Sequence, residues 1–168
     1  MFIERGSTSL TNNGVLASVA PRSFFEGSSS KALRAKFSEK LSLRVVANLA
    51  NTSLYQYAMV QSGFLIAKNG PIDDATTVVW TDPQASTPAK ALRGLRRFQL
   101  ERTVPISEPS FSVYRDSDIA KSSRDWLPRP YNAWALERLL RQRGGFVAAK
   151  SLYEIHQGVR MGSLLALV

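Results

Sequence analysis

The most concentrated chemical groups of this chain are basic side chains in the stretch AKALRGLRRF and just beyond it. They are Lys90, Arg93, Arg96, Arg97 and Arg102. At helical spacing, positions 93, 96 and 97 share one face, while Leu92 and Leu95 occupy another. Guanidinium groups in such a row can form bidentate contacts along a phosphate track. The pattern predicts a helix that faces DNA, and a solvated charged face on an ordinary helix is the alternative that stays open.

Two weaker basic groups follow later in the chain. Arg138 and Arg141 fall on one expected helix, but Glu137 lies beside them and offsets their charge. Arg160 stands between two glycines in HQGVRMG, where a basic side chain can approach DNA closely. We count all three as candidate DNA-binding residues.

Other chemistries are limited by composition. The chain of 168 residues has no cysteine and one histidine, His156, which excludes disulfides, thiolate metal sites and multi-histidine metal centres. No Ser or Asp spacing supports a triad through His156. The pairs Asp73-Asp74 and Asp116/Asp118 lack a ligand-rich loop and are interpreted as solvated turn residues. We therefore predict no catalytic residue and no metal ligand in this chain.

Charge points to an anionic partner. Lys and Arg number 22 against 13 Asp and Glu, a net charge of +9. Residues 1–88 carry 8 basic and 6 acidic side chains, and residues 89–168 carry 14 and 7. This asymmetry favours nucleic acid as the partner of the second part. No segment approaches the ~20 apolar residues of a membrane span, and the N-terminus lacks the apolar core of a secretory signal, so we expect a cytoplasmic protein.

The elements that must position these groups begin with strands. VLASVAP, residues 15–21, is apolar almost throughout, as in a central parallel strand covered on both faces. After a Gly-Ser loop, residues 31–41 form an expected helix with Leu33, Phe37 and Leu41 four apart. LRVVANL, residues 43–49, returns as a strand, so the unit predicts a right-handed parallel crossover.

Later strands are expected at residues 62–70 and 75–82, joined by a connection short enough only for antiparallel neighbours. Helices are expected at residues 89–98, despite Gly94, and at 131–143, stopped by Gly144-Gly145. Residues 103–130, rich in Pro and Ser, are expected to lack long regular elements. Within them and the following helix, Trp126, Tyr131 and Trp134 are interpreted as packing residues rather than a base-stacking platform.

Several runs resemble one family. The first is FIERGSTSLTNNGVLASVAPRSFFEGSSSKALRAKFSEK, which is similar to the C-terminal half of the catalytic domain of gamma-type adenine-N6 DNA methyltransferases of restriction–modification systems. LYQYAMVQSGFLIAKNG is similar to a later segment of that family, and ALRGLRR resembles its linker helix. FVAAKSLYEIHQGVRMGSLLALV resembles the opening of a target-recognition domain. Order and spacing of these runs carry the resemblance, since each motif alone is degenerate.

The resemblance implies specific roles and absences. Tyr55 stands where the family places an aromatic that stacks on the flipped adenine, with packing at a strand edge as the alternative. The family binds S-adenosylmethionine through an acidic, glycine-rich loop and catalyses with an Asn-Pro-Pro-Tyr tetrapeptide. Neither is present, because none of the eight prolines follows Asn or precedes Pro. The chain alone is therefore expected to bind no cofactor and to be inactive.

We accordingly predict a partial Rossmann-like α/β methyltransferase sheet, with parallel strands followed by antiparallel late strands, and a helical linker. The expected division is a methyltransferase-like half-domain (1–88), a basic and proline-rich linker (89–145) and the start of a target-recognition domain (146–168). Expected partners are double-stranded DNA and a second chain carrying the missing motifs, or another copy of this chain. A non-catalytic DNA-binding or assembly protein derived from such an enzyme is the alternative function.

Overall fold

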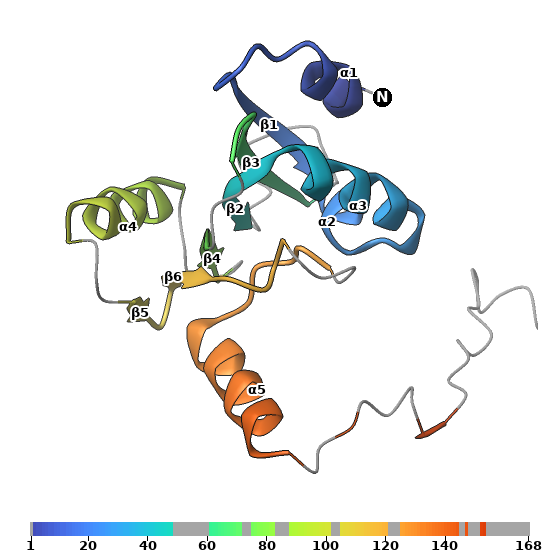
Figure 1. Ribbon diagram of the computed structural model, residues 1–168. Helices are drawn as coiled ribbons and strands as arrows, with labels where there is room; N and C mark the ends of the chain where they lie inside the picture. The colour runs from blue at the N-terminus through green and yellow to red at the C-terminus, as the bar shows by residue number, and fades with distance from the viewer. Residues whose placement is uncertain are drawn as a thin grey trace, which may run out of the picture. The chain divides into compact units, whose positions relative to one another are not determined.

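The computed structural model describes residues 2–48, 61–71, 75–82, 88–101, 105–120, 125–144, 147 and 152–153. Contacts divide the chain into two compact units, Met1–Trp134 and Ala135–Val168. The described part of the first unit is a mixed α/β fold around one sheet (Figure 1). The expected α/β class is therefore confirmed. No helix in the described ranges is both long and apolar enough to cross a membrane.

Six strands form the sheet in the order β1-β3-β2-β4-β6-β5. Their bounds are β1 (Val15–Pro21), β2 (Ser42–Asn48), β3 (Ser62–Lys68), β4 (Thr76–Thr81), β5 (Ile106–Glu108) and β6 (Phe111–Asp116). β3 is antiparallel to both β1 and β2, β2 is parallel to β4, and β6 is antiparallel to β4 and β5. The strands β1, β2 and β4 thus run in one direction.

This order confirms the parallel direction expected for β1 and β2 and corrects the expectation that β3 and β4 are neighbours. β1 and β2 run in the same direction, as the crossover requires, but β3 lies between them instead of the two pairing directly. β3 and β4 run in opposite directions, as expected, but β2 lies between them. The short link restricts strand direction, whereas the neighbour of each strand depends on pairing between residues far apart in sequence.

The position of β1 is a second correction. The apolar run Val15–Pro21 was expected to be central and covered on both faces. β1 instead forms one edge of the sheet, and its residues alternate between exposed and more buried positions. Val15 is 60% exposed and Val19 51%.

Helices cover the sheet on both sides (Figure 1). In the first unit these helices are α1 (Phe2–Thr8), α2 (Arg22–Glu26), α3 (Lys31–Lys40) and α4 (Pro88–Glu101), with a 3-10 turn at Ser28–Ser30. A further helix, α5 (Tyr131–Arg143), begins in the first unit and continues into the second. On one face Phe24, Phe25 and Phe37 pack with Val46 and Leu65. On the other face α4 packs on β4 and β6. The positions of α3, α4 and α5 agree with the sequence patterns, whereas α2 lies in what was expected to be a loop.

The region 103–130 also departs from expectation, because it contributes the hairpin β5–β6 to the sheet. The segment that follows is anchored by aromatic packing. Trp126 is fully buried, with its ring centroid 6.0 Å from Phe24 and 5.6 Å from Phe37. Tyr114 packs against Tyr131 and Trp134 at 5.6 and 4.8 Å. These contacts support the packing role predicted for Trp126, Tyr131 and Trp134.

One basic side chain is buried rather than solvated. Arg34 on α3 is 3% exposed, and its Nη1 donates hydrogen bonds to the Phe24 carbonyl at 2.7 Å and the Gly27 carbonyl at 3.0 Å. Asp125 lies 3.6 Å from Nη2. Burial lowers the pKa of Arg34, and Asp125 opposes that shift. Arg34 therefore ties α2 and the following turn to α3, so it belongs to the scaffold.

Candidate functional site

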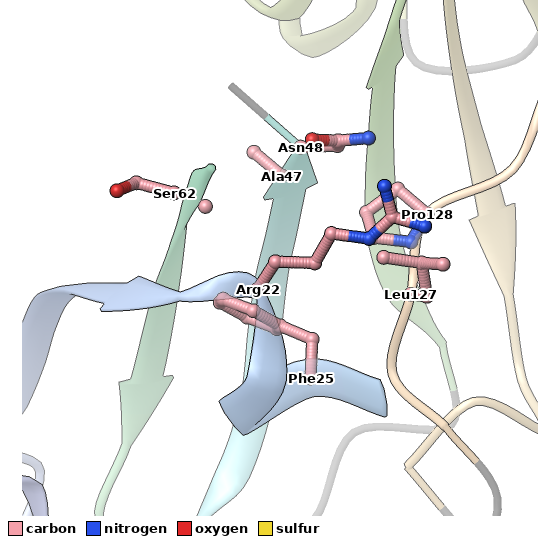
Figure 2. Close-up of a pocket in the computed structure, with 8 residues that line it drawn as sticks. Arg22, Phe25, Ala47, Asn48, Ser62, Leu127 and Pro128 are labelled. Carbon is pink, nitrogen blue, oxygen red and sulfur yellow. The ribbon is translucent and has the colours of Figure 1, made fainter. Parts of the chain in front are cut away.

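The carboxyl ends of β1, β2 and β4 lie at the same end of the sheet, because these strands share a direction. In open α/β sheets ligands bind outside the carboxyl ends of parallel strands. A shallow hollow lies there in the structure (Figure 2). Its lining residues are Arg22, Phe25, Ala47, Asn48, Ser62, Gly63, Leu127 and Pro128. They come from α2, β2, β3 and the segment before α5, which are far apart in sequence.

Close backbone packing shapes this hollow. A Cβ added to Gly63 would lie 2.5 Å from the Ala47 carbonyl oxygen and 2.8 Å from Phe25 Cε2. Only glycine fits without displacing β2 backbone or the buried Phe25 ring. Beside it, Thr81 Oγ1 donates a hydrogen bond to the Asn48 carbonyl at 2.8 Å, which joins the ends of β2 and β4.

Arg22 supplies the positive charge at the rim. Its Nη1 donates to Gln61 Oε1 at 2.6 Å, and its Nε lies 2.8 Å from Glu26 Oε1. The side chain is 41% exposed, and its guanidinium is held by Gln61 and Glu26. Figure 2 shows the Arg22 guanidinium extending toward Asn48 and Pro128. The site thus places an arginine, whose charge is partly neutralised by Glu26, beside the Asn48 amide.

Sequence reasoning missed Arg22 and Asn48. Isolated arginine and asparagine residues have no spacing signal, and their common location at the strand ends depends on the fold. A usable signal was available, however, since each residue stands at the end of a predicted strand, residues 15–21 and 43–49, that was expected to run parallel to the other.

Tyr55, the predicted base-stacking residue, lies outside the described residues. It follows Asn48, the last residue of β2, by seven positions. Arg102, Arg160 and His156 also lie outside the described residues, as do Asp73 and Asp74. The roles assigned to them stay predictions.

The predicted basic face is present on α4. Arg93, Arg96 and Arg97 are exposed, whereas Gly94 and Phe98 are buried on the opposite face of the helix. Lys90 is partly exposed on the same side as Arg93 and Arg97. The apolar positions were only half right, because Leu95 packs against the sheet but Leu92 is 49% exposed. We call Lys90, Arg93, Arg96 and Arg97 the α4 basic face.

Packing under α4 fixes the direction of this face. A Cβ on Gly94 would collide with the ring of Phe111 on β6. Gly94 therefore allows close approach of the helix to the sheet, which compensates for its lower helix propensity of about 1 kcal/mol against Ala. Arg115 on β6 places its guanidinium carbon 5.9 Å from the Phe98 ring centroid, adding a basic group that the sequence analysis did not select.

Acidic neighbours reduce the available charge at one end of α4. Arg97 Nε donates to Glu101 Oε1 at 2.9 Å. This hydrogen bond, with the charge of Glu101, raises the pKa of Arg97 above its usual value. Arg93 Nε instead reaches the Ala89 carbonyl of its own helix at 3.4 Å. The carboxylate makes Arg97 a weaker candidate for phosphate contact than Arg93 or Arg96.

In α5, which continues into the second unit, Arg141 is paired within its own helix. Its Nε and Nη2 donate to Glu137 Oε1 at 3.1 and 2.7 Å. Arg138 is exposed. The neutralising effect expected from Glu137 is therefore present for Arg141.

The described residues contain no cluster of three or more His, Asp or Glu side chains arranged to hold a metal ion. Asp116, one of the acidic loop residues, accepts hydrogen bonds from the Asp118 backbone N–H and from Trp134 Nε1, both at 2.9 Å. This carboxylate has a structural role in the turn after β6.

Comparison with known proteins identifies the fold. No protein-family model matches the sequence, and no curated protein matches it significantly. Solved structures do match. A modification subunit of a putative type I restriction enzyme from Vibrio vulnificus aligns over 70% of this chain with 14% identity and a TM-score of 0.55. The type IIG restriction endonuclease BpuSI aligns over 69% with 16% identity and a TM-score of 0.54.

The M protein of the type I restriction enzyme EcoKI aligns over 83% of this chain, with 15% identity and a TM-score of 0.53. These similarities establish a methyltransferase-like α/β fold. The chain spans 14% of the length of BpuSI, 27% of the Vibrio subunit and 41% of the EcoKI M protein. It therefore corresponds to a part of each of these chains.

Proposed function

We propose that this chain is a component or fragment of an adenine-specific DNA methyltransferase of a restriction–modification system. The observation that carries the proposal is its structural similarity to subunits and enzymes of such systems over 69 to 83% of its length. The sequence resemblance to gamma-type enzymes, reached from separate motifs, supports the adenine specificity. A protein with this role acts on DNA in the cytoplasm.

In this role the chain contributes DNA contacts rather than chemistry. The α4 basic face binds backbone phosphates, with Arg102, Arg138, Arg141 and Arg160 as further contacts. Tyr55 stacks on the target base once it has left the duplex. Arg22 and Asn48 stand at the carboxyl ends of the strands, in the part of the sheet from which the segment containing Tyr55 departs.

The cofactor and the catalytic tetrapeptide belong to a completing polypeptide. The sequence does not include the acidic, glycine-rich loop with which the family binds S-adenosylmethionine, so no step of methyl transfer is assigned to this chain. When bound to the completing polypeptide, the cofactor supplies the methyl group. This chain orients the DNA and the base.

The test is reconstitution. The chain is co-expressed with the product of the neighbouring reading frame, and transfer of labelled methyl groups to DNA is measured for each polypeptide and for the pair. We expect activity only from the pair, and a loss of at least tenfold with Tyr55→Ala but not with Tyr153→Ala, an exposed tyrosine outside the site. Methyl transfer by this chain alone, or a neighbouring product without Asn-Pro-Pro-Tyr, contradicts the proposal.

The alternative is a non-catalytic DNA-binding or assembly protein, favoured by the exposed α4 basic face. Three phosphate contacts predict a fall in affinity of about 40-fold between 50 and 200 mM salt. Replacing Arg93, Arg96 and Arg97 with Ala then flattens this salt dependence, whereas the same change at Arg5 and Arg44 does not. Salt-independent DNA binding excludes this alternative function. Methyl transfer by the reconstituted pair supports the role as a methyltransferase component instead.

A further inference from the structure

Among the described residues no strand pairs with the outer side of β1, which leaves a regular row of backbone groups without a strand partner there. The Arg22 N–H donates to the Gln61 carbonyl, and the Asn69 N–H to the Gly14 carbonyl, each at 2.8 Å. Antiparallel ladders alternate, so Leu16, Ser18 and Ala20 direct their backbone groups toward β3. Those of Val15, Ala17 and Val19 point to the open side. The Val19 carbonyl accepts a hydrogen bond from Ser18 Oγ at 3.2 Å, a local partner where a neighbouring strand would supply one.

The same three residues also expose their side chains. Val15, Ala17 and Val19 lie on the sheet face that α4 covers over β4 and β6, and all three are exposed. In register beside them on β3, Phe64 is opposite Val19 and Ile66 opposite Ala17, and both are only partly buried. We call Val15, Ala17, Val19, Phe64 and Ile66 the β1–β3 strip. One end of the sheet therefore lacks both a neighbouring strand and a covering helix among the described elements.

The composition of β1 fits a covered strand. Its residues VLASVAP carry no charge, and exposed edges are normally blocked by charged side chains, bulges or short length. Pro21 is compatible with pairing on the open side, because it stands at the end of β1. Near-continuous apolar runs are typical of strands buried on both faces. The sequence thus has the pattern of a strand whose outer side and second face are covered in the assembled protein.

A second copy of this chain would pair with the outer side of β1 but would not cover the β1–β3 strip. Pairing β1 with β1 of another copy would fill the backbone row of each edge. Directly opposite residues of an antiparallel pair project to the same face, so the two β1–β3 strips would join and double the exposed apolar surface. A strand followed or preceded by an amphipathic helix fills the edge and covers the strip together, as helices do on both faces of α/β sheets.

We propose that β1 is the docking edge for the completing polypeptide, which adds a strand beside Val15, Ala17 and Val19 and lays the apolar face of a helix across the β1–β3 strip. This inference rests on the proposed function, because that function supplies the occupant. The similar structures extend well beyond the part that this chain matches, which fits a completing unit of considerable size.

The experiment measures binding of this full chain to the purified product of the neighbouring reading frame, together with methyl transfer by the pair. Val19→Lys places a charge in the strip, and Ala17→Pro removes an outward N–H without removing a bond to β3. Each is expected to weaken association at least tenfold. Ser107→Lys, at an exposed position of the opposite edge strand, is expected to change it less than twofold. Circular dichroism and thermal unfolding confirm that each variant is folded.

Three results overturn the inference, and they are distinguishable. Association and methyl transfer unaffected by Val19→Lys and Ala17→Pro mean that the completing polypeptide docks elsewhere, while the proposed function stands. A homodimer of the chain, detected by light scattering and dissociated by Val19→Lys, means that a second copy occupies the edge. If the unmodified chain shows no association and the pair shows no methyl transfer, the proposed function itself is wrong. The completing polypeptide is then also ruled out as the partner of β1.

Discussion

The two edges of the sheet are built in contrasting ways. β5 is three residues long, carries the exposed Glu108, and lies on the side of the sheet where α4 covers the face. β1 is seven residues long and carries no charge, and no described element covers its outer side or the face that carries Val15 and Val19. Short length and charge are the usual protection against unwanted strand pairing. The β5 edge therefore has the features of a solvent-exposed surface, whereas the β1 edge has those of an interface.

The largest loss of stability is expected for a substitution on β3, which pairs with both β1 and β2. Gly63→Val places a side chain against the Ala47 carbonyl and the Phe25 ring, and backbone cannot yield as a flexible side chain would. We expect a loss of about 3 kcal/mol in the free energy of unfolding. Ser107→Val on β5 should change it by less than about 0.5 kcal/mol. Urea denaturation of both variants measures the contrast, and equal losses would refute it.

The stability of the β5–β6 end of the sheet depends on the close contact of α4 with β6. Gly94→Ala forces the Phe111 ring to move, and the cost of overpacking exceeds the gain in helix propensity, so we expect a net loss of about 1 kcal/mol. In the background of Phe111→Leu, the same change should become neutral or stabilising. This double-mutant cycle, read from denaturation midpoints, fails if Gly94→Ala costs the same in both backgrounds.

The open end should differ in surface rather than in stability. Val19→Lys alters a half-exposed side chain on an edge strand and is expected to change the unfolding free energy by less than about 0.5 kcal/mol. It should nevertheless reduce binding of an apolar dye to the isolated chain, since it interrupts the β1–β3 strip. Ser107→Lys, at the protected edge, should alter neither property. Equal dye binding by all three proteins would remove the contrast between the edges.

The smallest effect concerns the ion pair between α1 and α3, Lys36 Nζ to Glu4 Oε1 at 3.1 Å. The hydrogen bond and charge of Lys36 lower the pKa of Glu4 below its model-compound value of 4.5. A lowered folded-state pKa gives stability that is present above 4.5 and lost as the pH falls through the folded value. Denaturation midpoints of Glu4→Gln should therefore depend less on pH below about 5 than those of Glu39→Gln, its exposed control on α3. Identical profiles would show that the pair is fully screened.

Some of the candidate site residues could be predicted from the sequence, and others are recognised only in the folded structure. The arginines of α4 were selected from spacing alone, because 3.6-residue periodicity places positions 93, 96 and 97 on one face whatever the helix packs against. Arg22 and Asn48 were not selected, because only the fold brings the ends of β1 and β2 together. Arg34 was counted among ordinary charges, since nothing in its neighbours reveals that two backbone carbonyls will receive its guanidinium.

The sequence by itself determined where most strands and helices lie, the basic face of α4, and the absence of cysteine chemistry and of the family's catalytic tetrapeptide. These are local properties, set by periodicity, propensity and residue type. Only the tertiary structure decided that β3 separates β1 from β2, that Ile106–Asp116 joins the sheet, and that β1 is an edge. Strand order depends on hydrogen bonds between residues tens of positions apart. An apolar run predicts that a strand is buried, but it does not identify the element that buries it.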